Sequence, residues 1–338
     1  MVAESPPIAV SARNVRSERE TRAQQRARLR RQRPSRRPWW WRLLQIVLLA
    51  YLLVVLWMVY REPFLVYPGA FGPSAASPPR AVPPAELITY RSSSNIELAG
   101  QWIERGGAEN IVVFCHGNAE RAEDLVPSMR RLSELADASV LIVEYRGFAD
   151  SQTPNERGII VDATAAVQTL CERFDLDASE LTIYGRSLGG GVASAIAERF
   201  QCRELILERT FDSAVAVAAD RFWWLPVRLL MKNRFDTAAR LTNYHGRLMV
   251  VHGTKDDVIP IEHARRMIEQ AASEDITFRE LPSWGHLDAV PPELISEIAA
   301  WIRQGDREEA HSNEATGANF RGVGDDRHAG LPNRAGML

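Results

Sequence analysis

The run LTIYGRSLGGG at Leu181–Gly191 constrains the fold of this chain more than any other part of its sequence. Its apolar, partly β-branched beginning predicts a strand, and the small residues of Val192–Phe200 predict a helix directly after it. The turn between them reads GRSLG, the Gly-x-Ser-x-Gly pattern of a nucleophile elbow, which presents a serine hydroxyl at the end of a strand. Side chains at Gly185 and Gly189 would collide with so tight a turn. We therefore expect Ser187 to be a nucleophile at the edge of a sheet.

A nucleophilic serine requires a general base, an acid that orients this base, and hydrogen-bond donors for an oxyanion. The loops after two later predicted strands supply the first two groups. The earlier loop, in HGTKDDVIP, contains Asp256, and the later loop, in PSWGHLD, contains His286. We expect His286 to act as the base and Asp256 as the acid. The neighbouring Asp257 is the alternative acid if the loop is shifted by one residue.

The oxyanion donors are expected from two places in the chain. An early predicted strand, Asn110–Cys115, ends in the turn HGNA. In serine hydrolases with a nucleophile elbow, a His-Gly turn at this place brings a backbone N–H to the oxyanion. The expected donors are Leu188, directly after the nucleophile, and either Asn118 or Ala119. His116, which begins the turn, is interpreted as a residue that orders the loop rather than as a base.

From about Glu86 to Arg303 the chain resembles the α/β-hydrolases, whose triad residues follow the same order along the chain. It looks most like the branch of monoacylglycerol lipase-like, lysophospholipase-like and protein-depalmitoylase-like serine hydrolases, also described as serine aminopeptidase-like. The resemblance rests on FCHGNA at 114–119, EYRGF at 144–148, YGRSLGGG at 184–191, WLPVRLL at 224–230, HGTKDDVIP at 252–260 and GH at 285–286. It implies the fold and the catalytic residues but not the substrate. The chain departs from the family's Asp-Tyr-Arg-Gly-x-Gly-x-Ser loop at Glu144 and Ala149.

Predicted strands and helices alternate with short connections over residues 85–304, which we take as one α/β-hydrolase domain. This alternation predicts a mostly parallel central sheet with helices on both faces, opened by an antiparallel pair of strands. The catalytic loops are then expected at the carboxyl edge of the sheet. An excursion at about 210–246 is expected to form a short cap, in which Trp223 and Trp224 would contact an acyl chain or a lipid interface.

The N-terminal part of the chain predicts a membrane anchor. Leu43–Tyr60 has eighteen residues without a charge, which as a helix would be roughly 27 Å long, close to the thickness of a bilayer's hydrocarbon core. Residues 1–42 contain twelve Arg and three Glu, and the positive-inside rule places such a segment in the cytoplasm. We expect a cytoplasmic arm at 1–38, a transmembrane helix at 39–61, and a linker at 62–84 before an extracytoplasmic hydrolase domain. A cleaved signal peptide is the competing interpretation.

Other features of the sequence narrow the function further. Arginine-rich segments can bind nucleic acid, but the apolar run after this one favours a lipid bilayer as the partner. The polar, Gly-rich tail at 305–338 is expected to be disordered. The three cysteines do not make a disulfide scaffold, and whether Cys171 and Cys202 pair stays open, as does the oligomeric state. The sequence has no zinc-spaced Cys/His cluster, phosphate-binding loop or cofactor motif, so neither a metal nor a cofactor is expected.

Three functions remain as hypotheses. The leading one is a membrane-anchored serine hydrolase that cleaves carboxylic esters or thioesters of apolar acyl groups, with a small lipid or a lipidated protein as substrate. An exopeptidase of the same fold is the alternative among enzymes. It would need acidic groups to hold a substrate amine, and Asp212 and Asp220 are the only acids of the cap before Asp236. A hydrolase-like interaction module without catalysis is the alternative outside enzymes, and the complete triad argues against it.

Overall fold

The computed structural model describes residues 38–72, 77–92, 96–148 and 152–305, together with a few positions between 21 and 28. The chain divides into two units, Met1–Trp57 and Met58–Leu338, which are described separately. The predicted arm, apart from those few positions, and the predicted disordered tail after residue 305 lie outside the described residues, as does Ala149.

One long apolar helix, α2 (Trp39–Val66), accounts for most of the described part of the first unit. It has 28 residues, and an 18-residue window within it has a mean hydropathy of 2.5. By length and composition it could cross a membrane, as the uncharged run predicts. The helix continues to Val66, five residues beyond the predicted end of the anchor, and its last residues belong to the second unit.

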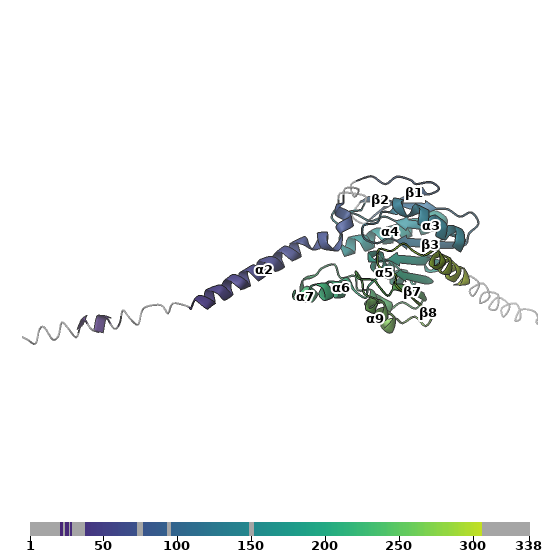
Figure 1. The fold of residues 1–338 in the computed structure, drawn as a ribbon. Coiled ribbons are helices and arrows are strands. Elements are labelled where there is room, and N and C mark those ends of the chain that lie inside the picture. The colour runs from purple at the N-terminus through teal and green to yellow at the C-terminus, as the bar shows by residue number, and fades with distance from the viewer. Residues whose placement is uncertain are drawn as a thin grey trace, which may run out of the picture. The chain divides into compact units, whose positions relative to one another are not determined.

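The second unit is built on a single eight-stranded sheet (Figure 1). Its strands are β1 (Glu86–Arg91), β2 (Glu97–Ile103), β3 (Asn110–Cys115), β4 (Ala138–Val143), β5 (Thr182–Arg186), β6 (Glu204–Glu208), β7 (Arg247–Gly253) and β8 (Ile276–Leu281). They lie in the order β1-β2-β4-β3-β5-β6-β7-β8, with β2 antiparallel to both of its neighbours and all other pairs parallel. The predicted mostly parallel sheet with an antiparallel opening is confirmed.

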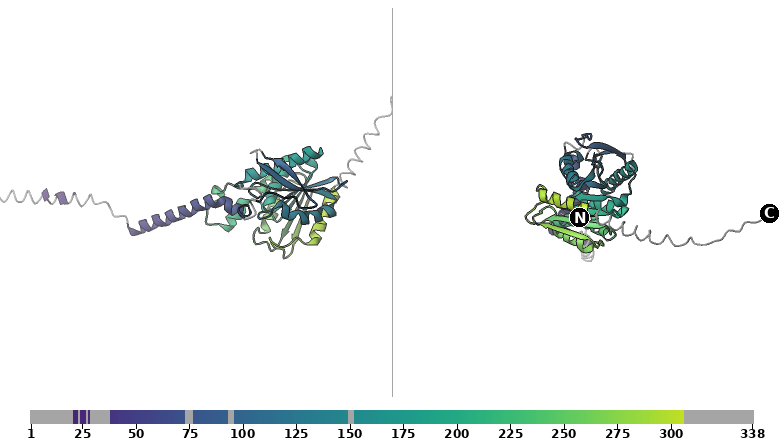
Figure 2. Two further views of the ribbon diagram at one scale, coloured as in Figure 1. Left: turned by 90° about the horizontal axis from the view of Figure 1, so that it is seen from above. Right: turned by 90° about the vertical axis from the view of Figure 1, so that its right-hand side faces the viewer.

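Helices cover both faces of the sheet, because each central strand is apolar on both sides and must be buried on both. The helices are α3 (Ala122–Ala136), α4 (Glu156–Phe174), α5 (Leu188–Phe200), α6 (Ala214–Arg221), α7 (Val227–Leu230), α8 (Thr237–Leu241), α9 (Glu262–Gln270) and a last helix at 292–305. One core contains the apolar faces of α4, α5, α8 and α9, and the other contains those of α3 and the last helix. Figure 2 shows the sheet between these helices from two further directions.

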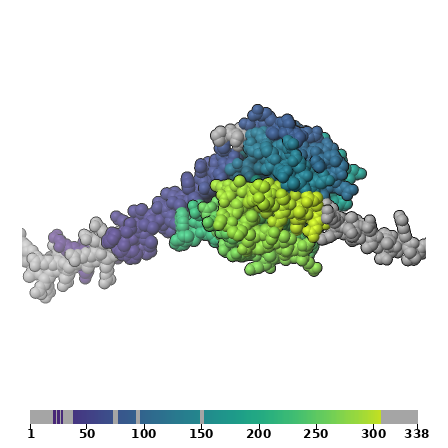
Figure 3. All heavy atoms as spheres, turned by 45° about the vertical axis from the view of Figure 1, so that its right-hand side comes forward, coloured from purple at the N-terminus to yellow at the C-terminus, as the bar shows by residue number. Residues whose placement is uncertain are grey.

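The strand order explains how the surface of the second unit is divided. Strands β1 to β4 lie on one side of β5, and β6 to β8 lie on the other. In the space-filling view, the blue and teal atoms of the earlier elements and the green and yellow atoms of the later elements accordingly form adjacent regions (Figure 3). Strand β5, which leads to the elbow, therefore lies in the middle of the sheet. It pairs with β3 on one side and with β6 on the other, so loops from both halves of the sheet can reach the elbow.

The segment 62–84 differs from the predicted linker over its first residues. Glu62 to Val66 complete α2, and Pro68–Phe71 form a short 3-10 helix, η1. Tyr67 is fully buried and Ala70 is nearly so, and both belong to the core around α4 and α5. The Pro and Gly residues that suggested a flexible linker serve here to make a tight turn against the domain. Residues 73–76 lie outside the described parts.

Candidate active site

The turn between β5 and α5 holds Ser187 in a conformation that few residues adopt. Its φ of 51° and ψ of −119° are strained for a residue with a side chain, as expected for an elbow nucleophile. A Cβ on Gly185 would lie 2.4 Å from the carbonyl oxygen of Gly189, and a Cβ on Gly189 would lie 2.0 Å from that of Cys115. Both positions therefore require glycine, since the nucleophile helix packs directly against the strand and loop before it.

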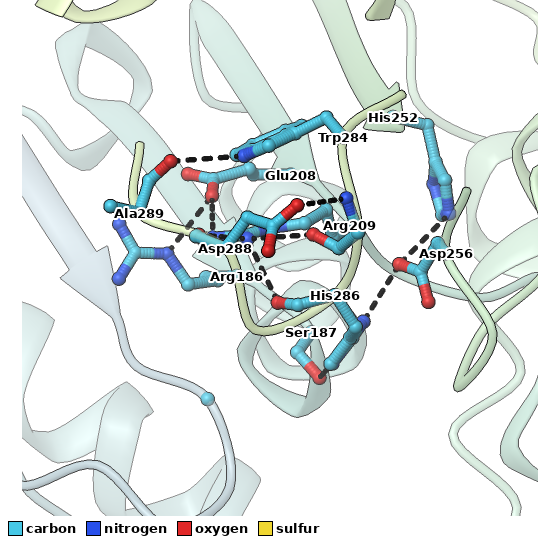
Figure 4. A network of polar contacts seen from close by, with 12 residues as sticks. Arg186, Ser187, Glu208, Arg209, His252, Asp256, Trp284, His286, Asp288 and Ala289 are labelled. Atoms are coloured by element: carbon cyan, nitrogen blue, oxygen red, sulfur yellow. Dashed lines mark hydrogen bonds and ion pairs between the residues drawn. The ribbon is translucent and has the colours of Figure 1, made fainter. Parts of the chain in front are cut away.

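Ser187, His286 and Asp256 form a continuous chain of hydrogen bonds (Figure 4). The Oγ of Ser187 lies 3.0 Å from Nε2 of His286, and Nδ1 of His286 lies 2.7 Å from Oδ2 of Asp256. The three residues follow β5, β8 and β7, whose carboxyl ends meet at one edge of the sheet. The structure thus brings together the three residues that the sequence analysis expected to cooperate. Asp257, the alternative acid, is exposed.

The surroundings of Asp256 keep its carboxylate ionised and fixed. Its Oδ1 accepts hydrogen bonds from the backbone N–H groups of Val258 and Ile259, at 3.0 and 2.8 Å. Its Oδ2 faces His286 and lies 3.4 Å from Nε2 of His252, a fully buried histidine. Burial alone would raise the pKa of Asp256, but the hydrogen bonds from His252, His286 and Ile259 outweigh it and lower the pKa below its ordinary value. A fixed, charged Asp256 therefore requires the proton of His286 on Nδ1, which leaves Nε2 free to accept the proton of the serine.

Two backbone N–H groups beside the nucleophile are available for an oxyanion. A Cβ on Gly117 would lie 3.4 Å from the Cβ of Ser187, so the turn after β3 reaches the elbow. The N–H of Ala119 donates to its neighbour's side chain, Oδ1 of Asn118, at 3.1 Å. Among the described residues, the N–H groups of Asn118 and Leu188 donate to no protein acceptor. Of the two predicted alternatives in this turn, the geometry favours Asn118 over Ala119.

A buried ion pair next to the triad was not foreseen from the sequence. Glu208, at the end of β6, is fully buried and accepts hydrogen bonds from the hydroxyl of Tyr184, from Nε of Arg186 at 3.1 Å and from Nη2 of Arg209 at 2.7 Å. Burial opposes ionisation of Glu208, but the two guanidinium groups outweigh it and lower its pKa. Arg186, beside the nucleophile, also pairs with Glu120, so its charge is used within the protein rather than offered to a substrate.

Arg209 connects this ion pair to the loop that carries His286 (Figure 4). Its Nη1 donates to the carbonyl oxygens of His286 and Asp288, at 2.8 Å each, and its guanidinium lies 4.0 Å from the centre of the Trp284 ring. The loop after β8 has no regular secondary structure of its own, so these bonds fix its path. The signal in the sequence is the pair Glu208-Arg209 directly after the apolar run LIL at 205–207, because charged residues in such a place are buried only if their charges are paired.

Glu144 stands where the family loop has aspartate, and its carboxylate pairs with a buried histidine, His116. Nε2 of His116 lies 2.9 Å from Oε1 of Glu144, whose Oε2 accepts the backbone N–H of Ala122 at 3.0 Å. Burial would lower the pKa of His116, but the carboxylate of Glu144 and the carbonyl of Gly117 together raise it. His116 therefore orders the turn that holds the expected oxyanion donor, in line with its interpretation as a loop residue.

The two candidate substrate-binding residues lie on the surface between α6 and α7. Trp223 is 83% exposed and Trp224 is 44% exposed. A ring as exposed as that of Trp223 is accessible to an acyl chain or to an external apolar surface. Within the described parts of the chain, no group of three or more His, Cys, Asp and Glu side chains is placed to hold a metal ion. Cys115, Cys171 and Cys202 are all free thiols, so Cys171 and Cys202 do not pair.

Comparisons with known proteins agree with the fold described above. The family described as alpha/beta hydrolase fold matches residues 110–238. An uncharacterized protein of Mycobacterium tuberculosis is 30% identical over 253 residues, which cover 72% of this chain and 85% of that protein. An uncharacterized membrane protein of Saccharomyces cerevisiae is 27% identical over 220 residues, 61% of this chain and 75% of that one. Among solved structures, an esterase of Pyrococcus furiosus superposes with a TM-score of 0.55 at 18% identity, over 68% of this chain and 97% of that chain, which is a likeness of fold.

Proposed function

The chain belongs to the α/β-hydrolase superfamily, and we propose that it is a serine hydrolase that cleaves carboxylic esters or thioesters through an acyl-enzyme. The observation that carries the proposal is the unbroken hydrogen-bonded chain from Ser187 through His286 to Asp256 at the carboxyl edge of the sheet. Esterase neighbours in fold support the same class of reaction.

Each residue of the site has a distinct role in this reaction. Ser187 attacks the acyl carbonyl while Nε2 of His286 takes its proton and then gives it to the leaving alcohol or thiol. Asp256 holds the imidazole by Nδ1 and stabilises the imidazolium. The backbone N–H groups of Leu188 and Asn118 donate to the oxyanion of the tetrahedral intermediate. Water, activated by the same histidine, then hydrolyses the acyl-enzyme and frees Ser187.

The full chain, purified in detergent, is expected to be labelled by a fluorophosphonate and to hydrolyse p-nitrophenyl butyrate. Ser187→Ala removes the attacking oxygen, so both labelling and hydrolysis are expected to disappear, with a loss in kcat on the order of 10⁶-fold by analogy with a serine protease. Gel fluorescence and absorbance assays measure the two effects. A folded wild-type chain that takes up no label would reject the hydrolase and favour the interaction module.

We also propose that α2 anchors the protein in a membrane, with the arginine-rich arm in the cytoplasm and the hydrolase domain outside. The apolar window of α2 and the yeast relative described as a membrane protein support an anchor. The protein is expected to stay with membranes during carbonate extraction, and protease added outside is expected to digest the hydrolase domain but not the arm. A soluble mature chain that begins near residue 70 would show instead that the apolar run is a cleaved signal peptide.

We propose that the enzyme recognises an apolar acyl group of its substrate. The cap exposes Trp223, Trp224 and Leu229, the last of them 85% exposed, which suits contact with acyl chains or a lipid surface. The proposed substrates are monoacylglycerols, lysophospholipids or S-acylated proteins.

The specificity of the enzyme for p-nitrophenyl esters is expected to rise with acyl length. Each CH₂ group buried in the enzyme contributes up to about 0.8 kcal/mol, roughly a fourfold gain in kcat/KM, until the pocket ends. Trp223→Ala or Trp224→Ala is expected to flatten this dependence while hydrolysis of the acetate ester, which reaches no acyl pocket, serves as the control. A flat profile in the wild type, or a preference for aminoacyl anilides, would favour the exopeptidase.

A further inference from the structure

The last residue of α2 and the short turn after it contact the turn expected to hold the oxyanion donor. Nδ2 of Asn118 donates to the carbonyl oxygen of Val66 at 2.7 Å, and Oδ1 of Asn118 accepts the backbone N–H of Gly69 at 3.2 Å. The same Oδ1 accepts the N–H of Ala119. Both polar atoms of the Asn118 side chain are therefore used to attach its turn to a segment about fifty residues earlier in the chain.

The approach between the two segments is closer at Gly69 than a side chain would allow. A Cβ on Gly69 would lie 2.3 Å from the backbone nitrogen of Ala119 and 2.4 Å from its Cα. Ala119 itself has a φ of 62°, an uncommon conformation for a residue other than glycine, asparagine or aspartate. A strained backbone of this kind persists only where neighbouring contacts hold it in place. Gly69 and Asn118 supply such contacts.

The same segment is also bonded to the cap, at Lys232 and Asn233. Oε1 of Glu62, a buried carboxylate, accepts three hydrogen bonds from Lys232 N, Asn233 N and Asn233 Nδ2, at 2.8 to 2.9 Å. The hydroxyl of Tyr67 donates to Oδ1 of Asn233 at 2.8 Å. The ring of Tyr67 packs edge-on against Phe235, which in turn lies against the nucleophile helix at Gly191.

We propose that the segment Glu62–Phe71 positions the oxyanion donor of the active site. It fixes the side chain of Asn118 and the strained backbone of Ala119, and thereby sets the direction of the Asn118 N–H, which donates to no protein acceptor in the described parts of the chain. Gly69, Val66 and Tyr67 are then positioning residues that do not touch the substrate. The end of the apolar helix is part of the catalytic apparatus rather than a tether. This inference rests on the proposed serine hydrolase function.

Gly69→Ala in the full-length protein is the most direct test. Its new methyl group must displace Ala119 and the donor turn, so kcat for p-nitrophenyl butyrate is expected to fall by about 10²-fold, as on loss of one oxyanion donor, while KM changes little. Affinity for a trifluoromethyl ketone, whose adduct carries the same oxyanion, is expected to fall in parallel with kcat/KM. The matched control is Gly72→Ala, whose Cβ would meet its nearest neighbour, Gly69 O, at an ordinary 3.4 Å, so that kcat stays within about twofold of the wild-type value.

Each outcome decides the proposal. Equal activity of Gly69→Ala and wild type, or an equal loss in Gly72→Ala, would overturn it. If thermal melting shows that Gly69→Ala does not fold, Asn118→Ala decides, because it keeps the backbone N–H of residue 118 but removes the side-chain bonds to Val66, Gly69 and Ala119. A fall of tenfold or more in its kcat, with KM and the melting transition retained, supports the positioning role, and a smaller fall refutes it. A wild-type chain that takes up no fluorophosphonate would instead contradict the hydrolase function itself.

Discussion

Replacing Asp256 by asparagine is expected to lower kcat by about 10⁴-fold, the size of effect seen for the acid of a serine protease triad. The hydrogen bonds around Asp256 explain why the asparagine amide cannot turn to accept the proton of His286 Nδ1. The backbone N–H groups of Val258 and Ile259 both point at Oδ1, so the amide oxygen must stay there and its NH₂ group must take the place of Oδ2. That NH₂ group would face Nδ1 of His286 and force the histidine proton onto Nε2. Nε2 would then be unable to accept the proton of Ser187.

Asp257→Asn is the matched control for this experiment. Asp257 is the next residue in the same loop but is exposed, so its loss is expected to leave kcat within about twofold of the wild-type value. Steady-state assays of p-nitrophenyl butyrate hydrolysis measure both variants, and thermal melting checks that both fold. Normal activity in Asp256→Asn together with a large loss in Asp257→Asn would move the acid by one residue.

The proposed catalytic residues could be grouped from the sequence because topology constrains their positions strongly. Parallel strands end at one edge of a sheet, so the loops after β5, β7 and β8 have to come close together whatever their detailed paths. A serine, an aspartate and a histidine in those loops can therefore be assigned to one site from their order alone. The sequence favoured Asp256 over Asp257 by its position in the loop, but it could not exclude Asp257, since this choice depends on which carboxylate the loop turns toward the core.

The neighbouring features that the sequence did not predict depend on side-chain contacts rather than on topology. Asn118 and Ala119 are equivalent by position, and they differ only because the N–H of Ala119 is used by the side chain of Asn118. The segment 62–72 has the Pro and Gly content of both linkers and tight turns, and composition does not distinguish the two. Tyr67 is fully buried in this segment while Phe71 is exposed, and nothing in the sequence separates these two aromatic residues.

The Glu208–Arg209 pair was missed for a related reason. Charged residues after an apolar strand ordinarily mark its exposed end, so the pattern of polar and apolar residues predicts that Glu208 and Arg209 are exposed. Here the strand ends inside the protein, where the sheet edge is covered by the loop of His286. Glu208 and Arg209 are therefore buried, and Arg209 holds the loop of His286 in place. These contacts form between segments distant in the sequence, so only the folded structure shows them.

Arg209→Met is expected to lower the free energy of unfolding by about 3–5 kcal/mol, because it leaves the buried carboxylate of Glu208 without one of its two cations. It is also expected to lower kcat, on the order of 10²-fold, because the loop of His286 loses the bonds that fix its carbonyl groups. The matched control is Arg265→Met, which breaks an exposed ion pair with Glu280 and is expected to cost about 0–1 kcal/mol. Urea unfolding and ester hydrolysis measure the two effects.

The double variant Glu208→Gln/Arg209→Met separates the two roles of Arg209. Removing the carboxylate together with the cation takes away the unmatched buried charge, so part of the lost stability is expected to return. The activity is not expected to return with it, because the introduced thioether has no N–H to donate to the carbonyl oxygens of His286 and Asp288. Recovery of kcat in the double variant would show that Arg209 acts only by balancing charge, and that the path of the histidine loop is fixed by other contacts, such as Trp284 Nε1 to Ala289 O at 3.0 Å.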